Sequence, residues 1–387
     1  MRPLRPSNWW LLVGAGLALA MAGLAAFQRL AFDDFSVFYT AAERWAAREP
    51  LYRAADGHYS FKYLPTTALL LSPLGALPYH WAAGTWAALL GLVAVGLLQR
   101  SIEALRSVGY SVPRWGVLLT ALVLAPSVAR ELGHGQLNLV CALLVLVGHT
   151  ALITGRPTWA GVWLALSVAL KPIALLIWPY WVLRRQWQAL GVSVILIGGL
   201  LLLSLLPYAL GSWPELARGW HTSTPGSTQA LLHLRDNSSW FGAWATWLGA
   251  GTSARWVYLA GAATLLGLAA LALPSLRQPV TPARATFELA ALLVAWVIAN
   301  PQGWVYGAAV LPLTVLVLLY DFEKQARAYR WGVGLSLLLV LVHLRRVWEP
   351  ILGPEVTERY LTSGVHPLAL SLWVALVCWR AARLPAC

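Results

Sequence analysis

Long apolar runs separated by short polar connectors make up most of the chain. The first runs are Trp9–Gln28, His80–Leu98, Trp115–Arg130 and Leu137–Ile153, and each approaches the roughly 20 residues that a helix needs to cross a bilayer. The later runs are Ala189–Leu210, Ala254–Leu273, Phe287–Ala299, Val305–Tyr320, Trp331–Leu344 and Pro367–Trp379. This pattern predicts an all-α polytopic membrane protein of about twelve helices, built as a single integral membrane domain over residues 1–387.

Two apolar segments depart from a simple crossing. The segment Thr158–Leu183 is too short for two full crossings and carries Lys171-Pro172 in its middle. Because the residue before a proline disfavours the helical conformation, we expect a hairpin of two short helices broken at Lys171. The segment Tyr63–Pro78 contains three prolines, which favours a partial dip into the membrane over a continuous span.

Two long polar stretches, about 29–79 and 211–253, interrupt the apolar runs. In the first, apolar residues recur at helical spacing from Phe35 onward and charged residues take the other face, which predicts a helix lying in the membrane interface. In the second, the aromatic segment Ser239–Leu248 predicts another interfacial helix.

Composition excludes a soluble protein, because 59% of the residues are hydrophobic and 11% are charged. The formal net charge of +13 comes without a block of Lys and Arg, so it predicts no nucleic-acid partner. The basic residues are densest in the short connectors, which places these connectors and both termini in the cytoplasm and the two long loops outside the cell membrane. Arg2 and Arg5 before the first run favour an uncleaved anchor over a cleaved signal peptide.

The motifs of nucleotide-binding and hydrolytic enzymes are absent, and the three cysteines indicate neither a disulfide framework nor a metal site. What remains is a set of acids and cations at the outer helix ends. Asp34 is the sharpest candidate for a general base, with Asp33 in reserve, although either acid is also a favoured helix N-cap. Lys171 is the sharpest candidate for binding an anion, because an ammonium inside an apolar hairpin is costly. Its alternative role is to satisfy the carbonyls freed by Pro172.

Two polar clusters add further candidates for binding a donor phosphate or a substrate. The first cluster runs from Arg130 to Asn138, and its alternative is a polar turn in which Arg130 pairs with Glu131 at the surface. The second runs from His233 to Ser239, and its alternative is a solvated loop. The candidates from the two clusters, together with two loop residues and two aromatic residues, are Arg130, His134, Gln136, Asn138, Arg235, Asn237, Lys62, Tyr63, Trp304 and Tyr306. Trp304 and Tyr306 are also typical of an interfacial aromatic belt.

One carboxylate and several cations at a water-facing membrane edge suit the transfer of a sugar from a lipid phosphate. The carboxylate of Asp34 would accept the proton of an attacking hydroxyl while a cation stabilises the departing phosphate. Two other classes stay open. A membrane transporter or lipid-linked-sugar flippase would use Lys171 as its substrate counterion, and an inactive scaffold for envelope assembly would use neither residue.

The order and spacing of several short motifs resemble glycosyltransferase family 87. These landmarks are Asp34–Tyr39, Pro50–Tyr52, Phe61–Pro65, Ser72–Leu74, Gly135–Asn138, Leu170–Pro172, Arg184–Trp187 and Asn300–Tyr306. The family resembles polyprenyl-phosphate-mannose-dependent α-(1,2)-mannosyltransferases, which implies a GT-C-like fold, a polyprenyl-phosphate donor carrying a hexose such as mannose, and a glycan or glycolipid acceptor.

The resemblance also assigns residues. It implies that Asp34 is the catalytic base of an inverting reaction on the extracytoplasmic side of the cell membrane, and that Asn237 belongs to a polar motif of the later loop. Tyr306 stands where many members of the family have histidine. The sequence indicates no cofactor and leaves a divalent metal open.

Overall fold

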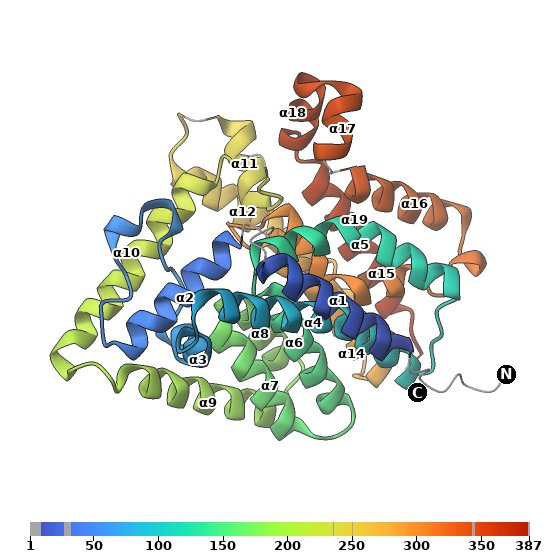
Figure 1. The fold of residues 1–387 in the computed structure, drawn as a ribbon. Coiled ribbons are helices and arrows are strands. Elements are labelled where there is room, and N and C mark those ends of the chain that lie inside the picture. The colour runs from blue at the N-terminus through green and yellow to red at the C-terminus, as the bar shows by residue number, and fades with distance from the viewer. Residues whose placement is uncertain (1–8, 27–31, 235, 250, 343–344, 386–387) are drawn as a thin grey trace. The chain divides into compact units, whose positions relative to one another are not determined.

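The computed structural model describes residues 9–26, 32–234, 236–249, 251–342 and 345–385. Within these ranges the protein is helical, with nineteen α-helices and five short 3-10 helices, and its only strand-like pairing is an isolated bridge between Asn237 and Trp304. The expected all-α class is confirmed (Figure 1).

Several helices have the length and apolar composition of membrane spans. In the described part of the chain, four are long enough to cross a bilayer: α4 (Tyr79–Ser107), α5 (Arg114–His134), α9 (Trp187–Leu205) and α19 (Val365–Ala382). Shorter apolar helical segments are Val13–Leu24 within α1 (Trp9–Ala26), α6 (Asn138–Ile153), α7 (Pro157–Leu170) and α12 (Ala254–Ala270). The protein is therefore a multi-pass membrane protein.

The chain forms two compact units. The first contains residues 1–100, 129–175 and 187–227, and the second contains residues 101–128, 176–186 and 228–387.

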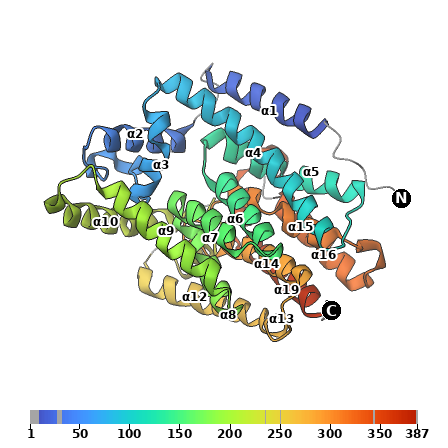
Figure 2. The same cartoon turned by 90° about the horizontal axis from the view of Figure 1, so that it is seen from below.

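In the first unit, helices α6, α7 and α9 lie side by side (Figure 2). The contact between α7 and α9 depends on Gly161, because a Cβ atom at this position would lie 2.5 Å from the carbonyl oxygen of Ala189. Small residues at such crossings let helix backbones approach closely, which is the usual way that helices pack in a bilayer.

Also in the first unit, α2 (Asp33–Ala46) packs against α3 (Pro65–Gly75). Phe35, Phe38 and Ala42 are buried on one face of α2, as the helical spacing of the apolar residues predicts. Trp45, on the same helix, donates from its indole nitrogen to the carbonyl oxygen of Ser204 at 2.8 Å. The amphipathic helix after the first apolar run is therefore confirmed, and it is anchored to its own unit.

The helix break predicted at Lys171 is confirmed. Helix α7 ends at Leu170, Lys171 is extended with φ −150° and ψ 110°, and a 3-10 turn begins at Pro172. Two threonines at the start of α3 satisfy two of the carbonyls at the break: Thr66 Oγ1 donates to Ala169 at 2.6 Å, and Thr67 Oγ1 donates to Leu170 at 3.0 Å. The ammonium of Lys171 donates instead to side chains of the Gln136–Asn138 turn.

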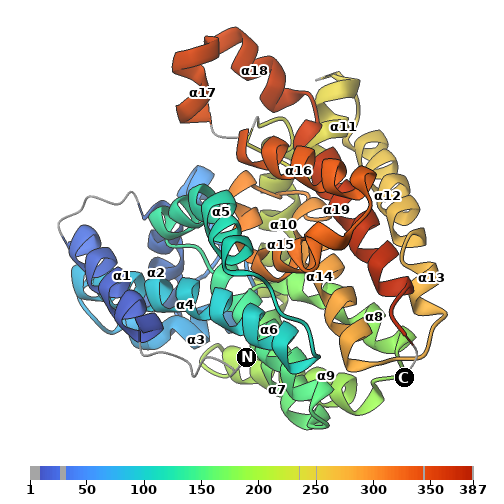
Figure 3. The same cartoon turned by 90° about the vertical axis from the view of Figure 1, so that its right-hand side faces the viewer.

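In the second unit, α14 (Pro282–Ile298), α15 (Pro312–Leu319), α16 (Arg327–Val342) and α19 pack around one another (Figure 3). The indole nitrogen of Trp373 on α19 donates to the hydroxyl of Ser336 on α16 at 2.9 Å. Helix α15 is preceded by η4 (Val305–Val310), so the run Val305–Tyr320 forms two short helices where one crossing was expected.

Helices of low overall hydrophobicity escape a search for apolar runs. The long polar loop contains α10 (Trp213–Leu231) besides the expected interfacial helix, which is α11 (Trp240–Leu248). Helices α4 and α5 extend further than expected, so that Arg130 lies inside α5. The remaining elements are η1 (Ala54–Tyr59), η2 (Pro172–Leu176), α8 (Ile177–Leu183), η3 (Leu210–Ser212), α13 (Leu273–Leu276), η5 (Phe322–Lys324), α17 (Arg345–Leu352) and α18 (Pro354–Thr362).

Candidate active site

Asp33 and Asp34 are the first two residues of α2, and neither is its N-cap. The N-cap position belongs to Phe32, which adopts a left-handed conformation with φ 49° and provides no side-chain cap. The amide of Phe32 donates instead to the carbonyl oxygen of Gly133 at 3.0 Å. Both carboxylates therefore lie in the first turn of α2, where the helix dipole favours negative charge. The capping alternative is wrong.

The two acids face different neighbours. Successive residues of a helix point about 100° apart. Asp34 interacts electrostatically with Lys62, Tyr63 and Lys171, whereas Asp33 lies in electrostatic range of Tyr79. Only Asp34 therefore belongs to a cluster that contains two lysines.

A glycine turn holds the start of α2 in place. Gly135 has φ +70°, and a Cβ atom there would lie 2.7 Å from the Cβ of Phe35. Its carbonyl oxygen accepts a hydrogen bond from the indole of Trp86 at 2.8 Å, and the Trp86 ring stacks on Phe35 with a centroid distance of 6.0 Å. Gly135 thus allows the residue next to Asp34 to contact the turn that carries Gln136.

Lys171 lies across from this turn. Its ammonium donates to Oδ1 of Asn138 at 2.6 Å and to Oε1 of Gln136 at 3.3 Å, and it lies 5.8 Å from the centre of the Tyr63 ring. An ammonium has three N–H donors. Two are taken by these amides, which leaves one for an anionic ligand.

Glu131 is a member of the site that sequence reasoning missed. Its side chain is fully buried; Oε2 accepts from Nδ2 of Asn138 at 2.9 Å, and Oε1 accepts from the amide of Leu139 at 3.3 Å. Glu131 is therefore not at the surface, and the alternative of a surface ion pair with Arg130 is wrong. By accepting from the amide nitrogen of Asn138, Glu131 turns the amide oxygen toward Lys171.

Lys62 and Tyr63 lie on the loop before α3, and both are partly buried. Burial lowers the pKa of Lys62 to about 8; Asp34 opposes this shift and Lys171 adds to it. Burial, with a smaller effect from Asp34, raises the pKa of Tyr63. The carbonyl oxygen of Lys62 accepts from Thr224 Oγ1 at 3.1 Å, and that of Tyr63 accepts from the hydroxyl of Tyr52 at 2.8 Å, so the loop is anchored at both residues.

The other predicted site residues of the first cluster are Arg130 and His134. Both are partly buried and lie in the last turns of α5. Their roles stay predictions. Arg235 lies outside the described residues.

In the second unit, an isolated bridge between Asn237 and Trp304 joins the segment before α11 to the turn before η4. Nδ2 of Asn237 donates to the carbonyl oxygen of Pro301 at 2.8 Å, and its Oδ1 accepts from the hydroxyl of Ser239 at 2.7 Å. The amide of Ser238 donates to the carbonyl oxygen of Gly303 at 2.6 Å. The Asn237 side chain is thus committed to holding the Pro301–Trp304 turn.

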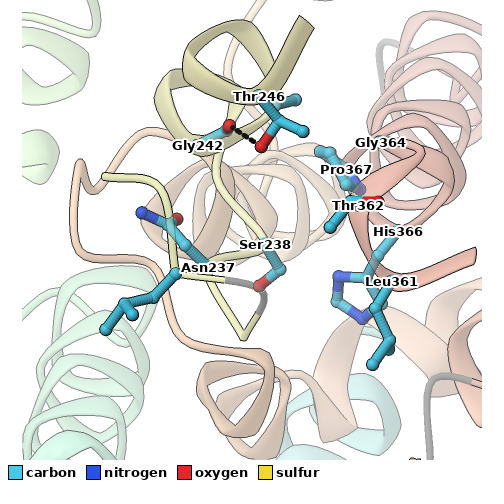
Figure 4. A pocket seen from close by; sticks show the side chains of 11 residues that line it. Asn237, Ser238, Gly242, Thr246, Leu361, Thr362, Gly364, His366 and Pro367 are labelled. Carbon is cyan, nitrogen blue, oxygen red and sulfur yellow. Dashed lines mark hydrogen bonds between the residues drawn. The ribbon is translucent and has the colours of Figure 1, made fainter. Parts of the chain in front are cut away.

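The aromatic pair Trp304 and Tyr306 and a small polar pocket both include a residue of this bridge or its neighbour. The rings of Trp304 and Tyr306 stack with a centroid distance of 6.4 Å. Asn237 and Ser238 line the pocket with Thr246 and His366 (Figure 4). Trp304 also pairs with Asn237 through the isolated bridge, and the binding roles of Trp304 and Tyr306 stay predictions.

Comparison with known proteins gives a family match and a similar solved structure. The family model described as glycosyltransferase family 87 matches residues 61–301, a segment that includes Lys62, Gln136 and Lys171 but not Asp34. A search of the curated proteins finds no match.

Among solved structures, the chain is similar to ArnT from Cupriavidus metallidurans bound to undecaprenyl phosphate. The identity is 13%, the alignment covers 97% of this chain and 78% of that chain, and the TM-score is 0.46. Since the family model matches well over half of the residues, the sequence match alone decides the family. The chain belongs to glycosyltransferase family 87.

Proposed function

We propose that this membrane glycosyltransferase moves a hexose, with mannose as the first candidate, from a polyprenyl-phosphate donor to a hydroxyl of a glycan or glycolipid. The observation that carries the proposal is the clustering of Asp34 with Lys62 and Lys171. A base next to two cations is what the transfer of a sugar from a phosphate requires.

Asp34 acts as the general base. Its carboxylate accepts the proton of the acceptor hydroxyl as that oxygen attacks the anomeric carbon, so the new C–O bond forms while the proton moves to Asp34. The side chain is partly exposed at the start of α2, where an acceptor can reach it. A positioned base contributes about 10²- to 10⁴-fold in rate.

Lys62 and Lys171 bind the donor phosphate. The bond between the anomeric carbon and the phosphate oxygen breaks, and its electron pair stays on the phosphate, which gains negative charge. Lys171 keeps one N–H for this oxygen after donating to Asn138 and Gln136. Because attack and departure take place on opposite faces of the sugar, the reaction inverts the anomeric carbon.

The reaction takes place on the extracytoplasmic side, with both termini in the cytoplasm. The support is the denser distribution of Lys and Arg in the short connectors on the other side. On the outer side of the membrane an activated sugar has to come attached to a lipid, which fits a polyprenyl-phosphate donor.

A transporter or lipid-linked-sugar flippase is the second candidate. The observation that favours it is the interrupted helix at Lys171, because broken helices carry substrate sites in many transporters. The two candidates differ in whether a covalent product forms.

A reconstitution experiment tests the proposal. Purified full-length protein in nanodiscs is incubated with polyprenyl-phosphate sugars labelled in the sugar, a panel of glycan and glycolipid acceptors, and either chelator or divalent metal. We expect label to pass to an acceptor in wild-type protein and not in Asp34→Asn, while Asp33→Asn stays active. Movement of the lipid across vesicles without any transfer of label would favour the flippase instead.

A further inference from the structure

Besides the pocket beside Asn237, the protein has a larger cavity, which lies in the first unit and is not lined by Asp34. Its volume is about 360 Å³, which is within the usual range for a ligand pocket. It lies between the end of α4, the end of α6 and the start of α7. The residues that carry its chemistry are Arg100, Arg156, Thr150, Thr154, Trp159 and Trp163.

The cavity has the charge of an anion site. Arg100 lines it from within α4 and Arg156 from the residue just before α7, and none of its lining residues is acidic. Thr150 and Thr154 donate their hydroxyl protons to carbonyls one turn back, at 2.9 Å and 2.8 Å. These hydroxyl oxygens therefore face a ligand as acceptors only, which suits the hydroxyls of a polar headgroup next to its phosphate.

Two tryptophans give the cavity an apolar wall. The rings of Trp159 and Trp163 are one turn apart on α7, with centroids 6.4 Å apart, and Trp159 is 56% exposed. Arginine next to exposed tryptophan is typical of the level at which the acyl chains of a bilayer meet the headgroups.

The cavity lies at the other end of α6 and α7 from Asn138 and Lys171. Asn138 begins α6 and Lys171 follows the end of α7, whereas Thr154 and Arg156 lie in the connection between the two helices. A helix of this length spans about 24 Å at 1.5 Å per residue. The cavity and the Lys171 cluster therefore lie about one helix length apart, at opposite ends of α6 and α7.

We propose that this cavity binds the headgroup of an anionic membrane phospholipid. The two guanidinium groups hold the phosphate, as arginine does by paired hydrogen bonds, and the tryptophans pack on the upper part of the acyl chains. The site is separate from the proposed donor site, because Lys171 follows the last residue of α7 whereas Arg156 and Trp159 lie at its start.

The test measures lipid binding without any reliance on transfer activity. Delipidated full-length protein in detergent is titrated with phosphatidylglycerol, phosphatidylcholine or inorganic phosphate, and bound molecules are counted by native mass spectrometry. We expect wild-type protein to retain phosphatidylglycerol at least about tenfold more tightly than phosphatidylcholine, because each cation near an anionic headgroup strengthens binding several-fold.

Variants locate the site. R100Q/R156Q is expected to lose at least about tenfold in affinity for phosphatidylglycerol, and the exposed single variant R156Q reports the same loss in part if the double variant does not fold. The matched control is R277Q, which removes an exposed arginine that does not line the cavity.

Three results would overturn the proposal. Equal retention of the two lipids would remove the charge selectivity, and an equal loss in R277Q would show a general charge effect. Displacement of phosphatidylglycerol by millimolar inorganic phosphate would indicate a site for free phosphate. None of these results depends on whether the protein transfers a sugar, so the lipid site and the proposed activity fail separately.

Discussion

The ammonium of Lys171 donates to Oδ1 of Asn138 at 2.6 Å, although 33 residues separate them in the chain. The other end of the same amide donates to the buried carboxylate of Glu131 at 2.9 Å. The three side chains form a relay in which Glu131 fixes the amide and the amide fixes the lysine. Glu131 therefore orients Lys171, the residue proposed to bind the phosphate, through Asn138 and without contacting Lys171 by a hydrogen bond of its own.

Asp34→Asn is expected to lower kcat by about 10²- to 10⁴-fold, because the amide cannot accept the proton of the acceptor. Donor binding should persist, because both lysines remain. Turnover of a labelled donor and equilibrium binding of the same donor measure the two effects. Asp33→Asn is the matched control, since Asp33 faces Tyr79 and not the lysines. Full activity in D34N would reject Asp34 as the base.

Glu131→Gln is expected to raise the donor KM about tenfold with a smaller change in kcat, which corresponds to losing about 1.4 kcal/mol of one charge-assisted interaction. The reason is that the carboxylate of Glu131 accepts at both oxygens, from Asn138 and from the amide of Leu139. A glutamine has one acceptor oxygen, so its NH₂ opposes one of these two donors and the hold on Asn138 weakens. Steady-state kinetics over a donor series measure this split between KM and kcat.

The double variant E131Q/N138D restores the relay and serves as the control. The introduced glutamine amide then donates to the introduced aspartate, and this carboxylate also accepts from Lys171, so each hydrogen bond has a donor and an acceptor again. We expect much of the lost donor affinity to return. A double variant as impaired as E131Q, or worse, would mean that Glu131 does not act through Asn138.

Donor capture should weaken as pH rises through about 8. Burial lowers the pKa of Lys62 to about 8, against an opposing effect of Asp34 and a reinforcing effect of Lys171. Below this pH Lys62 is an ammonium that attracts the phosphate, and above it the neutral amine does not. The pH profile of kcat/KM for the donor reports this free-enzyme group.

Two variants check the assignment of that pH dependence. Lys62→Arg stays charged throughout and should remove the fall in kcat/KM near pH 8, whereas Lys62→Met should have a high donor KM at every pH. An unchanged inflection in either variant would assign the titration to another group.

Gly135→Ala is expected to destabilise the protein by about 1–3 kcal/mol, because an L residue at φ +70° is strained and its Cβ would lie 2.7 Å from that of Phe35. The Phe35 backbone would have to shift, so activity should fall with stability. Thermal unfolding in detergent measures the change. Gly133→Ala is the matched control, since a Cβ there meets nothing within 4 Å. Equal unfolding temperatures for the two variants would mean that the turn does not hold α2.

The local pattern of apolar and polar residues determines the class of this protein and several of its helices. Apolar runs long enough to cross a bilayer indicate the class, and Lys171-Pro172 predicts the break in the hairpin because a proline constrains the residue before it. The helix that begins at Asp33 follows from the spacing of Phe35, Phe38 and Ala42. Each of these inferences depends only on residues within a few turns of one another.

Pairings between distant segments were decided only by the tertiary structure. Thr66 and Thr67 satisfy the carbonyls that precede Lys171, and Glu131 orients Asn138 from inside the unit. Phe32, and not an aspartate, occupies the N-cap of α2, where its amide donates to the carbonyl oxygen of Gly133. A sequence read alone supplies the donors and acceptors, but burial selects their partners, because each buried polar group has to be satisfied by whatever packing brings within reach.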